Sequence, residues 1–162
     1  MPPVTRLETL DSLLKLRAAW AEQGKTVVWT NGCFDILHVG HVRSLRDAKA
    51  LGDILVVGIN SDASVRAIKG PARPVVNQDD RAELLSALEP VDAVVIFDET
   101  EPSAILSVVK PDIHCKGAEY ADGQRPVPER AVVEAYGGQV RFLPLHEGRS
   151  TTAILQRAEQ AS

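Results

Sequence analysis

Thr30-Asn31-Gly32-Cys33-Phe34-Asp35-Ile36-Leu37-His38-Val39-Gly40-His41 is the stretch around which the rest of the chain is organised. Residues 26–29, just before it, are β-branched and aromatic, as in a buried strand. After it, apolar residues recur at helical spacing, and charged residues occupy the opposite face. We therefore predict a strand, a loop, and a helix that begins at the His-x-Gly-His segment.

A strand-to-helix loop of this kind is suited to binding phosphate. Exposed backbone N–H groups and the positive end of the helix dipole both favour an anion at a helix N-terminus. Gly32 and Gly40 lack a Cβ, so a ligand can approach the backbone closely there. His38 and His41 stand beside the helix start and can donate hydrogen bonds to one phosphate and to its bridging oxygen.

Two other interpretations of the histidine pair stay open at this point. A histidine near a helix start is often a cap or a surface residue, although a pair separated by glycine fits that role less well. Zinc is the second alternative, with nitrogen ligands drawn from His38, His41, His114 and His146. Zinc sites with helical histidines need a third identifiable ligand, and Cys33 and Cys115 are isolated rather than paired. We therefore predict phosphate contact and no metal held by the protein.

The remaining sequence alternates between strand and helix patterns. Predicted strands lie at 26–30, 54–59, 91–97, 113–115 and 140–143, with helices between them from 9–22 to a last helix capped by Ser150-Thr151-Thr152. The alternation predicts a Rossmann-like α/β fold, in which a five-stranded parallel sheet carries helices on both faces. A length of 162 residues suits a single domain over 1–162, with 1–24 as an N-terminal helix and 25–162 as the core.

Several polar segments follow predicted strands and should therefore share one rim of the sheet. They are 31–41, 60–62, 116–120 and the region of Ser150. Their convergence favours an active site over isolated capping motifs, although Asp62 or Ser61 can also serve as a helix cap. Lys69-Gly70-Pro71-Ala72-Arg73-Pro74 is either a solvated surface loop or a loop whose cations close over a polyphosphate.

Composition excludes several classes of partner. The net charge of −4 gives no support to nucleic-acid binding. No apolar run approaches the roughly 20 residues of a membrane helix. The first residues, Met1-Pro2-Pro3-Val4-Thr5-Arg6, lack the apolar core of a secretion signal, and two isolated cysteines suggest reduced thiols. We expect a cytoplasmic protein that binds neither nucleic acid nor membrane.

The pattern Gly32-x-Phe34-Asp35-x-x-His38-x-Gly40-His41 resembles the signature of the cytidylyltransferase-like nucleotidyltransferases. Within that superfamily, residues 30–38 are similar to bacterial heptose 1-phosphate adenylyltransferases, which occur alone or as the C-terminal domain of a bifunctional heptose kinase/adenylyltransferase. The likeness covers residues 7–154, nearly the whole chain. It implies an enzyme, a homodimer, that joins a phosphorylated sugar to the α-phosphate of ATP with Mg²⁺ and releases pyrophosphate.

The same resemblance implies a role for particular residues. His38 and His41 would contact the triphosphate, and Lys69 would act with them from a mobile loop. Nucleotide binding would fall to Gly32, Cys33, Phe34, Gly40, Lys116, Gly117, Glu119, Arg149, Ser150 and Thr151. Asp35, Asp62 and Arg81 would bind the acceptor. No residue is assigned to a metal.

The sequence also departs from the heptose enzymes, and two other functions stay open. Lys116-Gly117-Ala118-Glu119-Tyr120 stands where those enzymes usually read Lys-Gly-Gly-Asp-Tyr. One alternative is a CTP-dependent cytidylyltransferase for a polyol phosphate such as glycerol 3-phosphate, but Leu145 stands where such enzymes have an arginine. The other is a nucleotide-binding sensor without turnover, against which the intact His38, His41 and Lys69 argue.

Overall fold

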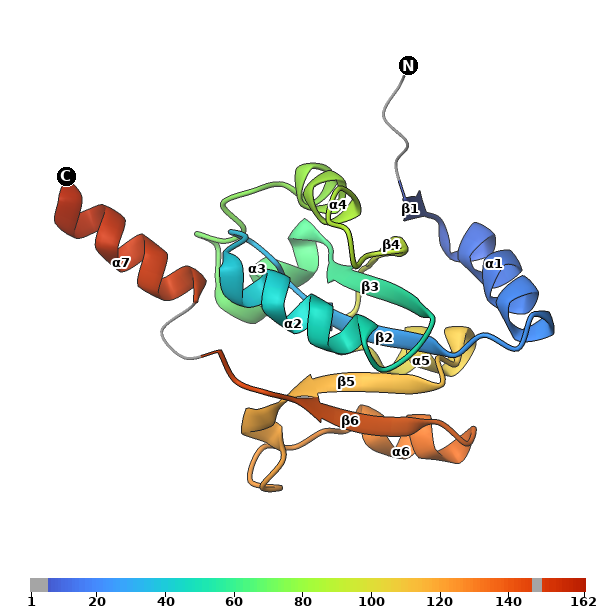
Figure 1. Ribbon diagram of the computed structural model, residues 1–162. Coiled ribbons are helices and arrows are strands. Elements are labelled where there is room, and N and C mark those ends of the chain that lie inside the picture. Colours follow the sequence, from blue (N-terminus) through green and yellow to red (C-terminus); the bar gives the residue numbers. More distant parts are fainter. Residues whose placement is uncertain (1–5, 147–149) are drawn as a thin grey trace, which may run out of the picture.

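The computed structural model describes residues 6–146 and 150–162, and within them a parallel sheet of six strands forms the centre of the molecule (Figure 1). The strand order is β1-β4-β3-β2-β5-β6. The strands are β1 (Leu7–Glu8), β2 (Val27–Gly32), β3 (Ile54–Asn60), β4 (Ala93–Phe97), β5 (Ile113–Gly117) and β6 (Gln139–Leu143). The helices are α1 (Leu10–Glu22), α2 (Val39–Lys49), α3 (Asp62–Lys69), α4 (Gln78–Ser86), α5 (Ser103–Val109), α6 (Glu129–Ala135) and α7 (Thr151–Ala161), with a 3-10 turn η1 (Ala118–Tyr120).

The predicted fold class is confirmed, but the predicted number of five strands is wrong. The additional strand, β1, has two residues and lies at the edge of the sheet, where Leu7 pairs with Val94 and Glu8 with Val95. Two residues cannot show the alternation by which strands are recognised in a sequence. β2 also runs beyond its predicted end, because Asn31 and Gly32 still pair with Gly58 and Ile59 of β3.

The sheet separates two apolar layers, and neighbouring residues of each central strand point into different layers. Leu55 and Val57 of β3 pack with residues of α2 and α4 on one face. Val56 of the same strand packs with α1, α5 and α6 on the other. Strands buried on both faces produce the continuous apolar runs seen in the sequence. Trp29, fully buried, packs over Gly58, where a Cβ would lie 2.3 Å from the indole ring.

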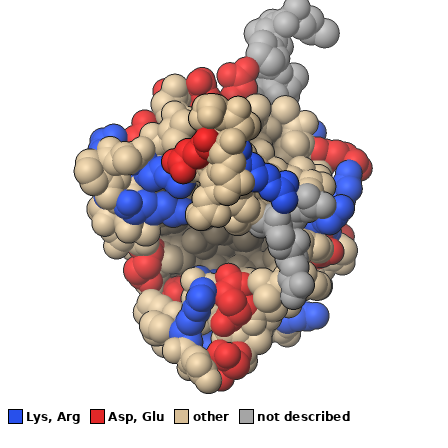
Figure 2. Space-filling model, turned by 90° about the vertical axis from the view of Figure 1, so that its left-hand side faces the viewer, with Lys and Arg blue, Asp and Glu red and all other residues tan. Residues whose placement is uncertain are grey.

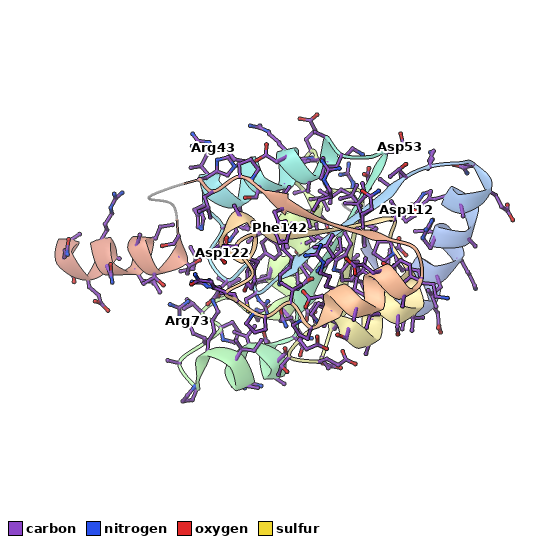
Figure 3. The ribbon with its side chains drawn as sticks, turned by 90° about the horizontal axis from the view of Figure 1, so that it is seen from below. Arg43, Asp53, Arg73, Asp112, Asp122 and Phe142 are labelled. Atoms are coloured by element: carbon purple, nitrogen blue, oxygen red, sulfur yellow. The ribbon has the colours of Figure 1, made fainter. Side chains whose placement is uncertain are left out.

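The two ends of the sheet differ in character. At the amino end of β2, Asp53 accepts a hydrogen bond from the Thr26 N–H and Asp112 accepts one from the Val27 N–H, each at 2.8 Å. Figure 3 shows both aspartates at one end of the molecule, whereas Arg73 lies at the end from which α7 leaves. The carboxyl ends of the strands thus face the side where helices and loops contribute cations.

Helix α7 extends away from the sheet, and only its first turn approaches the other elements (Figure 1). Ser150 caps it by accepting a hydrogen bond from the Ala153 N–H at 3.0 Å. Thr151 Oγ1 donates to the Ile36 carbonyl at 3.1 Å, which ties the start of α7 to the loop before α2. Two helix N-termini, those of α2 and α7, therefore meet at the carboxyl end of the sheet. None of the helices in the described part of the chain is long and apolar enough to cross a membrane.

Candidate active site

A cavity of about 490 Å³ lies at the carboxyl ends of β2, β5 and β6, beside the N-termini of α2 and α7. Figure 2 looks onto this side of the molecule and shows a hollow with Lys and Arg side chains beside it. The structure brings many of the predicted site residues into its lining: His38, Gly40, His41, Lys69, Lys116, Gly117, Glu119, Ser150 and Thr151. Arg149 lies outside the described residues.

His38 and His41 form a reciprocal cap at the start of α2. The Gly40 N–H donates to His38 Nδ1 at 3.1 Å, and the His38 N–H donates to His41 Nδ1 at 3.3 Å. Because both Nδ1 atoms accept, each neutral ring carries its proton on Nε2. The rings stack with centroids 3.9 Å apart and planes 28° from parallel. Each imidazole therefore caps the helix through Nδ1 and carries its N–H donor on Nε2.

His41 is held in its neutral form. Burial is the main reason that the pKa of His41 is lowered to about 4, and Lys69, together with His38 whenever that ring is protonated, acts in the same direction. At neutral pH the ring is thus uncharged, with its Nε2 proton available for donation rather than for release. A neutral donor of this kind can bind an anion without first titrating.

The loop before the histidines contains an unusual backbone conformation. Phe34 has a φ of +48°, in the left-handed region that non-glycine residues seldom adopt. Its ring turns back toward the site, 5.2 Å from the His41 ring, and a Cβ on Gly32 would lie 3.2 Å from it. Such conformations persist where the surrounding structure holds them, frequently at ligand sites. Gly32 and Phe34 thus shape the backbone next to His41.

Cys33, in the same loop, is held as a neutral thiol, which is a weaker nucleophile than a thiolate. Burial raises its pKa above the ordinary value for cysteine. Its sulfur lies 3.9 Å from Asn60 Oδ1, to which it can donate. The predicted contribution of Cys33 to nucleotide binding through its backbone stays a prediction.

Asp35 is buried, and its carboxylate holds the loop that follows Lys69. It accepts hydrogen bonds from the Val75 and Val76 N–H groups at 2.9 Å and from Arg73 Nη1 at 3.3 Å. Burial by itself would raise the pKa of Asp35, but these donors outweigh it and the pKa lies below the usual value. The structure therefore gives Asp35 a loop-anchoring contact, and its predicted contact with the acceptor stays a prediction.

Arg81 is fully buried and joins three segments at the rim of the sheet. Its guanidinium donates to the carbonyls of Cys33 at 2.6 Å, Asn60 at 2.8 Å and Val76 at 2.9 Å. It also forms an ion pair with Asp62 Oδ1 at 2.8 Å. None of the three predicted acceptor residues, Asp35, Asp62 and Arg81, is among the described residues that line the cavity.

The opposite wall of the cavity is built by the end of β5 and by η1. Glu119 folds back over Gly117, where a Cβ would lie 2.2 Å from Glu119 Oε2. Within the described chain, Oε2 is buried and has no hydrogen-bond partner. Lys116 Nζ lies 4.2 Å from the centroid of the Tyr120 ring and 3.1 Å from Glu129 Oε1. An added substituent at position 117 would therefore displace the Glu119 carboxylate.

Glu129 and His114, which touch this wall from behind, were not among the predicted site residues. His114 is spaced two residues before Lys116 on β5, so strand periodicity places both side chains on one face. Glu129 follows an irregular segment, and no spacing rule connects it to β5.

The described residues do not by themselves build a magnesium site. Among described residues that line the cavity, Glu119 is the one carboxylate. No group of three or more His, Cys, Asp or Glu residues in the described part of the chain is placed to hold a metal ion. Magnesium would therefore enter as part of a nucleotide substrate, bound by phosphate oxygens.

Together these features define an α/β protein in which the N-termini of two helices, α2 and α7, border a cavity of about 490 Å³ at the carboxyl end of the sheet. Residues 29–157 match the family described as cytidylyltransferase-like. The chain therefore belongs to the cytidylyltransferase-like family of nucleotidyltransferases.

Two curated relatives carry the same name, bifunctional protein HldE. The protein from Syntrophotalea carbinolica is 46% identical over 153 residues, which cover 94% of this chain. The protein from Geobacter sulfurreducens is 47% identical over 157 residues, which cover 96% of this chain. The chain spans 31% of the length of each of these relatives.

Two solved structures share the fold. A lipopolysaccharide core biosynthesis protein from Thermoplasma volcanium has a TM-score of 0.62 and 28% identity, over 78% of this chain and 100% of that chain. A pantoate-beta-alanine ligase from Francisella tularensis, crystallised with an ATP compound and beta-alanine, has a TM-score of 0.61 at 13% identity. It covers 90% of this chain and 68% of its own, and at this identity it shows the fold alone.

Proposed function

We propose that this chain is a heptose 1-phosphate adenylyltransferase, which joins the sugar phosphate to the α-phosphate of ATP and yields ADP-heptose and pyrophosphate. The observation that carries the proposal is the pair His38–His41, which lines the cavity. Both side chains cap the N-terminus of α2 through Nδ1 and carry their protons on Nε2. The relatives named bifunctional protein HldE, at 46% and 47% identity, support heptose as the acceptor and lipopolysaccharide precursor synthesis as the pathway.

The chemistry asks little of the protein beyond positioning and charge stabilisation. An oxygen of the acceptor phosphate attacks the α-phosphorus of ATP, the bond from that phosphorus to the bridging oxygen breaks, and pyrophosphate leaves. Because the nucleophile is already an anion, no serine, cysteine or general base is needed. The Nε2 protons of His38 and His41 would stabilise the developing charge, and Lys69 would neutralise the leaving pyrophosphate.

The remaining properties follow from the same proposal. The substrate would be MgATP, with the ion carried by the nucleotide and the acceptor a phosphorylated sugar. We infer a cytoplasmic homodimer in which residues 1–162 form one nucleotidyltransferase domain, with 25–162 as the catalytic core and α1 in the segment before it. The nucleotide would lie along Lys116, Gly117 and Glu119, with its phosphates at the starts of α2 and α7.

ATP should be preferred over CTP by at least about tenfold in kcat/KM, which is about 1.4 kcal/mol in transition-state binding. Purine and pyrimidine differ in size and in hydrogen-bonding edge, so a cavity shaped for one discriminates against the other. The measurement is the release of pyrophosphate from ATP or CTP in the presence of Mg²⁺, with both heptose 1-phosphate and glycerol 3-phosphate supplied as acceptors. In the control, EDTA removes Mg²⁺, and release should stop.

The same panel separates the alternatives. A preference for CTP would move the assignment to a polyol phosphate cytidylyltransferase. Nucleotide binding without pyrophosphate release from any combination would instead indicate a sensor.

Lys69→Ala should lower kcat/KM for ATP by about 30-fold, because a positive charge that pairs with no described carboxylate is lost from the cavity. Lys69 ends α3, lines the cavity, and forms no ion pair with any described residue. Gly70, at a φ of +97°, follows it and allows the chain to turn there. Arg73→Ala should cost less, because Arg73 is paired with Asp35 rather than directed at substrate.

Limited proteolysis of residues 69–74 checks the accompanying loop closure. Cleavage should be slower with ATP than without it, since closure over the polyphosphate would order the loop. Equal cleavage rates in both conditions, or equal losses for Lys69→Ala and Arg73→Ala, would contradict a closing loop.

A further inference from the structure

Two buried side chains, those of Glu129 and His114, stand behind the part of the cavity wall that Lys116 forms, and the transfer described above uses neither of them. Glu129 Oε1 lies 3.1 Å from Lys116 Nζ and 3.1 Å from His114 Nε2. Glu129 is 1% exposed and His114 is completely buried. One carboxylate oxygen therefore binds two residues of the same strand, β5.

Glu129 is charged at every pH at which the protein would work. Burial alone would raise its pKa, but the hydrogen bonds and charges of His114 and Lys116 outweigh burial and lower it to about 2. The His114 Nε2 atom, facing an ionised oxygen, must carry a proton and donate it. Glu129 is thus an acceptor that holds His114 at the back of the wall and Lys116 at its face.

The consequence for Lys116 is a fixed ammonium position. Its side chain is 18% exposed, and its Nζ lies between Glu129 Oε1 and the face of the Tyr120 ring, 4.2 Å from the ring centroid. A lysine otherwise has a flexible four-carbon stem with large rotamer freedom. Both Lys116 and Tyr120 line the cavity, so anything that moves Lys116 changes the cavity wall.

We propose that Glu129 is a positioning residue for nucleotide binding, which acts through Lys116 and does not touch the nucleotide. This inference depends on one part of the proposed function, namely that the nucleotide binds in the cavity. Glu129 itself is absent from the described residues that line the cavity. It would affect the binding step rather than the transfer step, because it holds the Lys116 ammonium beside the Tyr120 ring before the nucleotide binds.

A purely structural role is the alternative, and it predicts different behaviour. Buried ion pairs are often replaceable without loss of stability, while removal of one partner can be costly. If Glu129 only stabilised the fold, its removal would lower the melting temperature and the active fraction without changing the affinity of the folded protein. A positioning role changes the affinity itself.

The test is the isosteric change Glu129→Gln in the full chain, with the dissociation constant of ATP measured by calorimetry. We expect binding weakened by about tenfold, since the neutral amide no longer gives the Lys116 ammonium an ionic partner and holds it less firmly. In turnover, KM for ATP should rise by the same factor and kcat should stay within about twofold. Lys116→Met should give a similar loss, and the double variant should lose no more than Lys116→Met alone.

The matched control is Glu134→Gln on the same helix, α6. Glu134 pairs with Arg130 at 2.8 Å on the exposed surface, so its replacement should leave ATP binding unchanged. If Glu129→Gln does not fold, Glu129→Asp keeps the charge and withdraws it from Lys116. The same loss of ATP affinity is expected.

Unchanged ATP affinity in a folded Glu129 variant would overturn the inference, as would tighter binding caused by a released Lys116 cation. Additive losses in the double variant would also overturn it. Wild-type protein that binds ATP but releases no pyrophosphate with heptose 1-phosphate would refute the proposed function and leave this inference standing. Wild-type protein that binds no nucleotide would refute both.

Discussion

Replacing His38 or His41 with alanine should lower kcat by about 10²–10³-fold, the usual cost of losing one donor to a developing oxyanion. Both imidazoles use Nδ1 to cap α2, which leaves Nε2 as the proton-carrying atom. Neither ring needs to titrate to act as a donor. The measurement is steady-state turnover with ATP and heptose 1-phosphate, with the fold followed by circular dichroism.

The alanine variants also remove a helix cap, which is worth about 1 kcal/mol of stability. His38→Asn separates the two effects, because asparagine is among the preferred N-cap residues but has no imidazole Nε2–H. It should therefore restore stability and not turnover. Recovery of turnover in His38→Asn, or normal turnover in both alanine variants, would contradict the assignment of these histidines to the reaction.

The pH dependence of stability provides a further check on His41. Its pKa is about 4 in the folded protein, below the ordinary value of 6.5, chiefly because burial disfavours the charged ring. As pH falls from about 6.5 toward 4, the unfolded chain binds a proton that the folded protein does not, so stability declines. The wild-type protein should therefore lose stability over this range, and His41→Ala should lose less. An identical decline in both would contradict the lowered pKa.

The features predicted correctly from the sequence are those encoded locally. The strand before Thr30, the helix after His38 and the alternation of strands with helices rest on spacing within a few residues. The convergence of 116–120 and Ser150 on one rim followed from parallel topology, since the carboxyl ends of parallel strands share an edge. The family resemblance, resting on the same motif, is confirmed by the match over residues 29–157.

The features missed depend on contacts between distant residues. β1 is a strand only because Leu7 and Glu8 meet β4 across the edge of the sheet. Glu129 reaches β5 only because α6 returns beside it, after an irregular segment with no periodic pattern. Such contacts are set by tertiary packing, which overrides local propensity. They leave no periodic pattern in the sequence from which they could be predicted.

Arg81 shows a different limit of prediction from sequence. A residue that matches a family motif can be recognised in the sequence, but the atoms that its side chain contacts cannot. The resemblance suggested an acceptor contact, whereas the folded chain directs the guanidinium at three carbonyls and Asp62. These partners belong to the ends of β2 and β3, the start of α3 and the segment before α4. The arrangement predicts that Arg81 holds the rim together before any substrate arrives.

Arg81→Met should therefore lower the free energy of unfolding by about 3 kcal/mol, because three buried carbonyls lose their donor. For a domain of this size, that change corresponds to a melting temperature lower by about 10 °C. Arg66→Met is the matched control: Arg66 is exposed on α3, and its loss should change stability by no more than about 0.5 kcal/mol. Denaturant and thermal unfolding measure both variants. A stable Arg81→Met variant whose only defect was a raised KM for heptose 1-phosphate would contradict the rim-holding role, because losing the residue that holds the rim must cost stability. It would support the predicted acceptor contact instead.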